Sequence, residues 1–171
     1  MKSFFPILFI FCSCFIFSQK FGEYYVTNNN DTIKCDILKH SYERLIVLEN
    51  GQKKKYKPHE IKLFSVFVGA PVKYVSLLNN KNQFYVERIK GKLSLYHIDD
   101  WDFYTKSIVL ANVLVKDNKI IKLRSNTSNR NTISKLISDC PTVLEDWNNK
   151  EKYPTENIER VIESYNNCSK N

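Results

Sequence analysis

The sequence predicts an α+β fold, in which an antiparallel β-meander precedes a C-terminal cap of about three helices. The pattern is compatible with a sheet that curls into a barrel and does not require one. Short stretches that alternate apolar and polar residues recur between positions 23 and 123, separated by Asn, Asp and Gly turns. From position 133 onward, apolar residues instead recur at steps of three and four, which is the helical period. A hairpin over Phe84–Ile98 is the unit from which the other strands are expected to pair outward.

Residues 1–18 are predicted to be a secretory signal peptide. Met1 and Lys2 give a positive start, Phe4–Phe17 is almost entirely apolar, and Ser18 precedes the expected cleavage site. The alternative is a membrane anchor, but the apolar run is shorter than the roughly 20 residues that a spanning helix needs. We therefore expect an exported protein, periplasmic or extracellular, with no spanning membrane segment after leader cleavage.

The remaining chain is expected to form one domain, with an antiparallel β region over 19–126 and a helical region over 127–171 packed on it. The first strands are predicted at 23–27, at 32–38 and around Asn50-Gly51, the strongest hairpin signal in the chain. Residues 60–67 fit either one helical turn that leads into a strand or a strand throughout. A strand at 72–77 and a turn at 79–82 follow.

In the central hairpin, Lys90-Gly91 is expected to form a two-residue loop in which Gly91 has a positive φ. Val86 then lies opposite Leu95. In this register one face is apolar and buried, and the other, with Tyr85 and Tyr96, is not.

The acidic run 99–102 is expected to be a loop, followed by a short strand at 103–105 and a hairpin around Asp117-Asn118. An apolar helical stripe from Ile133 to Trp147 is interrupted at Pro141. Because proline fits the first turn of a helix and not its interior, two helices are predicted to meet there. A third helix is expected after Thr155, with Glu156 early in it.

The cysteines predict one covalent link. In an exported protein Cys140 and Cys168 are expected to form a disulfide, because antiparallel packing of the C-terminal helices would bring them together. A loop of this size corresponds to about 3.5 kcal/mol in the chain-entropy model. Cys35 is interpreted as a buried strand residue beside Ile33 and Ile37.

The formal net charge of +8 favours contact with anionic surfaces such as phospholipid or acidic polysaccharide, and we expect no nucleic-acid partner. Four clustered lysines are a possible polyanion contact: Lys53, Lys54, Lys55 and Lys57. The same lysines also suit a purely structural role, since lysine keeps an exposed strand edge from pairing with another chain.

Few catalytic patterns are present. With only four glycines, the sequence has no glycine-rich phosphate loop, and His59-Glu60 lacks the second histidine of a zinc-protease helix. The nearest approach to an acid–base cluster is His97 with Asp99 and Asp102. Aspartates after a strand are also common turn residues. We therefore assign no catalytic residue and expect no cofactor and no metal.

Several segments together resemble a group of exported Bacteroidetes proteins with no established activity. They are Tyr25-Val26-Thr27 with Asp31-Thr32-Ile33-Lys34, Tyr56-Lys57-Pro58 with Glu60-Ile61-Lys62 and Phe64, Gly91-Lys92-Leu93-Ser94-Leu95-Tyr96, Asp139-Cys140-Pro141, and Tyr165-Asn166 before Cys168. The resemblance implies an envelope or extracellular location and carries no catalytic residue. That group often has glycine in place of Cys35, which argues against a shared disulfide there.

The function expected from these observations is that of an exported, non-enzymatic binding or interaction protein of the cell envelope, its partner an unknown envelope component. Two alternatives remain open. One is an envelope hydrolase with a site near His97, Asp99 and Asp102, and the other is a β-barrel carrier of an apolar ligand.

Overall fold

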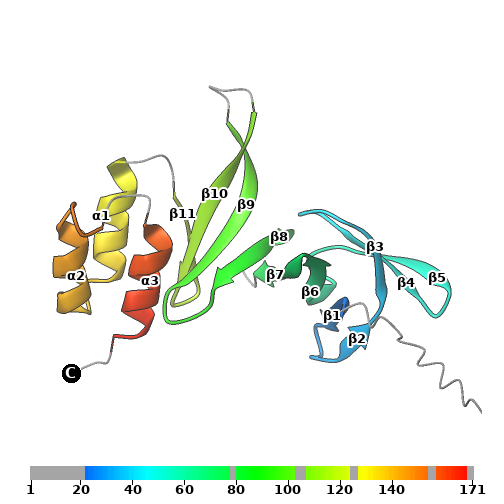
Figure 1. Ribbon diagram of the computed structural model, residues 1–171. Helices are drawn as coiled ribbons and strands as arrows, with labels where there is room; N and C mark the ends of the chain where they lie inside the picture. The colour runs from blue at the N-terminus through cyan, green and yellow to red at the C-terminus, as the bar shows by residue number, and fades with distance from the viewer. Residues whose placement is uncertain (1–21, 78–79, 103–106, 124–126, 154–156, 169–171) are drawn as a thin grey trace, which may run out of the picture.

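The computed structural model describes residues 22–77, 80–102, 107–123, 127–153 and 157–168, which form two antiparallel sheets and three helices (Figure 1). The larger sheet has the order β11-β10-β9-β8-β7-β6-β1-β2. Its strands are β1 (Tyr24–Thr27), β2 (Thr32–Lys34), β6 (Ile61–Val68), β7 (Ala70–Leu77), β8 (Asn80–Ile89), β9 (Ser94–Asp102), β10 (Ser107–Lys116) and β11 (Lys119–Lys122). The smaller sheet consists of β3 (Asp36–His40), β4 (Leu45–Glu49) and β5 (Gln52–Tyr56). The helices are α1 (Thr127–Leu136), α2 (Pro141–Asn148) and α3 (Ile158–Asn166).

The predicted fold class is confirmed, because the chain is mostly antiparallel sheet followed by three C-terminal helices. The larger sheet is open, with β11 at one edge and β2 at the other, so it is not closed into a barrel. Figure 1 shows the helices at one end of the molecule, beside β9 to β11, and the smaller sheet at the opposite end. None of the helices in the described ranges has the length and apolar character needed to cross a membrane.

Two predicted hairpins form as expected. In the turn between β4 and β5, Asn50 and Gly51 have φ angles of 52° and 75°. In the turn between β10 and β11, Asp117 and Asn118 have φ angles of 49° and 61°. Two consecutive positive φ angles match the right-handed twist of the flanking strands, which is why Asn, Asp and Gly occupy these positions.

The strand predicted at 32–38 is instead two strands that belong to different sheets. β2 pairs with β1 in the larger sheet, and after Cys35 the chain turns into β3, which pairs with β4. Glu23 holds the turn, since its backbone carbonyl accepts from the Cys35 amide and its carboxylate from the Ile37 amide, at 3.3 and 2.8 Å. An alternating pattern continues across this break and so did not reveal it.

Other boundaries also differ from the prediction. The ambiguous stretch at 60–67 is the strand β6, and the turn placed at 79–82 is wrong because β8 already begins at Asn80. The acidic run 99–102 is strand rather than loop, since Asp99 pairs with Leu110 and Asp102 with Ser107. The predicted leader at 1–18 and the short strand at 103–105 lie outside the described residues.

The register predicted for the central hairpin is wrong. Val86 lies opposite His97 rather than Leu95, and an irregularity between Glu87 and Ile89 brings Ile89 opposite Leu95. The connection spans residues 90–93, and the φ of Gly91 is not positive. The glycine is required for a different reason, because a Cβ added to it would overlap the side-chain amide of Asn166.

The prediction that one face of this hairpin is exposed is also wrong. Phe84 and Tyr85 are neighbours on opposite faces of β8, and both are buried. Phe84 packs in a cluster with Phe64 of β6, whereas Tyr85 packs with Tyr96 and residues of β10. When both faces of a strand are covered, apolar residues point to both sides, so the alternation of apolar and polar residues no longer identifies one exposed face.

The helices meet where the sequence predicts. Cys140 precedes α2 and Pro141 opens it, so the missing proline N–H costs no helical hydrogen bond. The third helix starts at Ile158, later than expected, and Thr155 lies outside the described residues. The helices cover one face of the sheet through a core that includes Leu93, Leu95 and Trp147.

Candidate functional site

The smaller sheet has one buried and one uncovered face. Leu45 and Val47 of β4 are fully buried against the larger sheet. Residues directly opposite each other in an antiparallel pair share a face, as do alternate residues along a strand. Ile46 pairs with Lys55 and Leu48 with Lys53, so these residues lie on the uncovered side. We call this side the basic face, and its residues are Asp36, Leu38, Lys39, Arg44, Ile46, Leu48, Lys53, Lys55 and Lys57.

The basic face combines positive charge with exposed aliphatic groups. Leu38 is 52% exposed and Leu48 is 37% exposed, and both stand among lysines. Leu38 lies at an irregularity in the pairing of β3 with β4, where two successive residues, Leu38 and Lys39, are both exposed. Of the residues that form this face, only Asp36 is acidic.

A pocket of about 390 Å³ lies where the basic face meets the start of β8. It is lined by Glu43, Arg44, Lys55, Lys57, Pro58, His59 and Asn82. In the described part of the chain, the side chains of Arg44, Lys55 and Lys57 form no ion pair, although the Glu60 carboxylate accepts from the backbone amide of Lys57. Because Glu43 is the one acidic residue of the lining beside three cationic ones, the lining carries a net positive charge, which favours an anion.

The predicted polyanion contact is divided by the sheet. Lys53, Lys55 and Lys57 lie on the basic face, whereas Lys54 points to the other side and pairs with Glu49 at 3.0 Å. That hydrogen bond, together with others from Tyr25 and Tyr56, lowers the pKa of Glu49. Lys54 therefore lies on the side of the sheet opposite the basic face, where it pairs with Glu49.

The Glu49 carboxylate links the two sheets. Tyr25 of β1 donates to it at 2.8 Å and contacts the Tyr56 hydroxyl at 2.9 Å. Burial, with these hydrogen bonds, strongly raises the pKa of Tyr25, so its hydroxyl stays a donor. This network fixes the smaller sheet, and hence the pocket, relative to the larger one.

His97 lies in β9 opposite Asn112 of β10, away from the basic face. Burial and the nearby Arg88 guanidinium lower its pKa, which favours the neutral imidazole. Arg88 pairs with Glu159 of α3 at 3.2 Å, with both side chains about half exposed. The side chains of Asp99 and Asp102 lie outside the described residues, so the predicted cluster is represented here by His97 alone.

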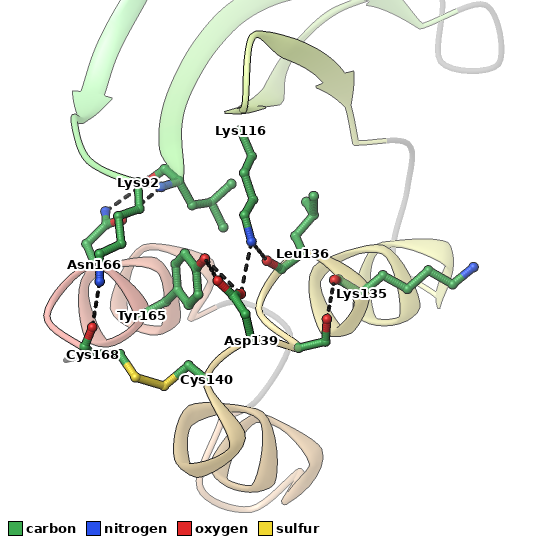
Figure 2. A network of polar contacts seen from close by, with 11 residues as sticks. Lys92, Lys116, Lys135, Leu136, Asp139, Cys140, Tyr165, Asn166 and Cys168 are labelled. Carbon is green, nitrogen blue, oxygen red and sulfur yellow. Dashed lines mark hydrogen bonds and ion pairs between the residues drawn. A yellow bond between two sulfur atoms is a disulfide. The ribbon is translucent and has the colours of Figure 1, made fainter. Parts of the chain in front are cut away.

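The disulfide is present between Cys140 and Cys168, whose Cα atoms are 6.5 Å apart. Figure 2 shows a polar network beside it, in which Asp139 accepts from Tyr165 at 2.9 Å and from Lys116 at 3.0 Å. Lys116 comes from the end of β10, so the network attaches the helices to the sheet, while the bridge joins the start of α2 to the residues after α3. Cys35 is a half-buried free thiol, and burial, with nearby carboxylates, raises its pKa to about 11. That pKa makes Cys35 a poor nucleophile.

The sequence pattern singled out Lys55 and Lys57, which line the pocket, but it did not identify the other lining residues. Arg44 and His59 flank the lysine run, but Asn82 comes from a distant strand and no local motif connects it to them. No group of histidine, cysteine and acidic side chains suited to a metal ion occurs among the residues that the structure describes.

The chain was compared with known proteins. No protein-family model matches it, and neither the curated proteins nor the solved structures contain a match.

Proposed function

We propose that this is an exported, non-enzymatic binding protein of the cell envelope that holds an anionic group in the pocket beside the basic face. The observation that carries the proposal is that three cationic side chains, Arg44, Lys55 and Lys57, line one pocket with a single carboxylate, Glu43, and form no ion pair within the described ranges. The export rests on the leader pattern of residues 1–18.

The chemistry of the pocket favours an oxyanion over other ligands. A guanidinium offers paired N–H donors that match the geometry of a phosphate or carboxylate, and lysines add mobile point charges. Most of the lining residues are polar or charged, and Pro58 is its only apolar residue. A pocket of this kind suits a charged ligand and does not suit the apolar cargo of a carrier protein.

The proposal is tested by isothermal titration calorimetry with inorganic pyrophosphate at low salt. Arg44→Gln with Lys57→Gln should weaken binding at least tenfold, because each removes a charge-assisted contact. The matched control is Lys135→Gln with Lys150→Gln, which removes the same charge from exposed positions on the helical part. This control should bind as the wild type does.

Equal binding by the pocket variant and the control would contradict the proposal, because the affinity would then follow net charge alone. The proposal would also be contradicted if neither the wild type nor the control bound pyrophosphate.

A further inference from the structure

We propose that the basic face is a docking surface for a phospholipid bilayer with anionic headgroups. The inference rests on the proposed function, because both assign binding to the smaller sheet. It goes further by naming the kind of surface that this sheet binds. The pocket would then receive one headgroup while the face lies along the membrane.

The charges are placed for a flat partner. Lys53 and Lys55 lie on the same side of β5, Lys57 comes at the next alternate position just after the strand, and alternate residues of a strand are about 6.6 Å apart. Lys39 lies on the same side two strands away, across Ile46. Such an array extends in two dimensions, so it can contact many headgroups at once.

The exposed aliphatic residues distinguish a bilayer from a soluble polyanion. Leu38 and Leu48 stand among the lysines, 52% and 37% exposed. An acidic polysaccharide would pair with the lysines but would leave these side chains in water. At the boundary between headgroups and acyl chains, lysines reach the phosphates while leucines enter the apolar layer, so both kinds of side chain contribute.

The location of the face permits this contact. The opposite side of the sheet is occupied by the core around Leu45 and Val47, so only the basic face is free to meet a surface. The helices lie at the other end of the molecule, as Figure 1 shows, and do not stand in the way of a membrane at this end.

The test is co-sedimentation with vesicles of phosphatidylcholine alone and of phosphatidylcholine with 30% phosphatidylglycerol. The wild-type protein should partition onto the anionic vesicles, and less so as salt is raised. Leu38→Gln with Leu48→Gln, which leaves the charge unchanged, should reduce partitioning about tenfold. The matched control is Leu110→Gln, since Leu110 is 59% exposed on the larger sheet. This control should partition as the wild type does.

A second variant tests the charges. Lys53→Gln with Lys55→Gln should weaken partitioning about fivefold for each lysine removed. Circular dichroism checks that all variants are folded, as expected for substitutions at exposed positions.

Pyrophosphate titration of the same variants separates the inference from the proposed function. The leucine variant should keep the wild-type affinity for pyrophosphate while it loses the vesicles. If the leucine variant partitioned onto vesicles as well as the wild type does, membrane docking would be overturned. It would also be overturned if the wild-type protein bound an acidic polysaccharide such as alginate but did not bind vesicles. In either case pyrophosphate binding in the pocket would still support the proposed function.

Discussion

Asn166 holds the central hairpin through its side chain. Its amide donates to the Leu93 carbonyl and its carbonyl oxygen accepts from the Leu93 amide, each at 2.9 Å. The side chain thus forms the pair of hydrogen bonds that a neighbouring strand would form with Leu93. Gly91 lies directly against it, and a Cβ at that position would overlap the Asn166 amide group, so a larger residue would displace Asn166.

We expect Gly91→Ala to lower the free energy of unfolding by about 2 kcal/mol, because the added methyl group displaces Asn166 and breaks its bonds to Leu93. Urea denaturation measures the change. In an Asn166→Ala background the obstruction is gone, so the same substitution should cost much less. Equal costs in both backgrounds would show that the close approach of Asn166 is not the reason for the glycine.

Asp139 carries the charge that connects α3 to β10. Hydrogen bonds from Lys116 and Tyr165 lower its pKa, in spite of the opposing effect of desolvation. Partial burial opposes the charged form of Lys116, but hydrogen bonds with Tyr165 and Asp139 outweigh it and raise its pKa. The ammonium also lies 4.8 Å from the centre of the Tyr165 ring.

A carboxyl whose pKa is lowered by folding stabilises the protein above its unfolded pKa of about 3.9 and loses this contribution as the pH falls through the folded value. Asp139→Asn should therefore destabilise the protein by about 1 kcal/mol at pH 7, discounted because Asp139 is half exposed. The difference should shrink below about pH 4. Urea titrations between pH 2.5 and 7 test this. Asp146→Asn is the control, because its partner Lys152 is half exposed, unlike Lys116, so loss of this pair should change stability little.

The helices depend on the sheet and on the disulfide rather than on their own helical propensity. Each is short, at 8 to 10 residues, and helices of this length are marginal when isolated in water. Arg130 of α1 stacks on Trp147 of α2, 4.2 Å from the ring, and donates to the Trp147 carbonyl. The bridge then joins the start of α2 to the residues after α3.

We expect Cys140→Ser to lower the melting temperature by about 10 °C without reductant, because loss of the bridge corresponds to roughly 3 kcal/mol. With reductant, most of the difference from the wild type should disappear. Differential scanning calorimetry gives both values. Cys35→Ser is the control, since Cys35 is unbridged and its effect should not depend on reductant. Equal melting temperatures without reductant would contradict a stabilising bridge.

The molecule is held together by its larger sheet. Within the described residues, the buried apolar side chains form three clusters: one under the helices, one between the two sheets and one on the remaining face of β7 to β10. β8 contributes to all three, through Ile89, Phe84 and Tyr85, and β9 contributes to two of them. Damage to one cluster is therefore expected to affect the others.

Phe64→Ala tests this connection, because Phe64 is fully buried and stacks on Tyr74 at 4.6 Å. It should destabilise the protein by about 3 to 5 kcal/mol. In a Trp101→Phe background, Trp147 fluorescence reports on the helices and far-UV circular dichroism on the whole chain. Both should move to the same lower urea midpoint. A Trp147 transition that stays at its original midpoint would show that the helical region unfolds independently.

The sequence by itself determined the features that depend on neighbouring residues. Two hairpins follow from Asn50-Gly51 and Asp117-Asn118, whose positive φ angles are local properties. The break at Pro141 follows from the ring of that residue, and the helical period placed Cys140 and Cys168 at helix ends that pack together.

Only the tertiary structure decided the features that depend on distant contacts. The connection between β8 and β9 is held by hydrogen bonds between Leu93 and Asn166, which lies 73 residues further along the chain. The turn at Cys35 is held by Glu23. The pocket joins Lys57 to Asn82, which no local pattern connects. Periodicity reports which side of an element is apolar, but it does not report which partner covers that side, and the partner decides whether a face becomes core or binding surface.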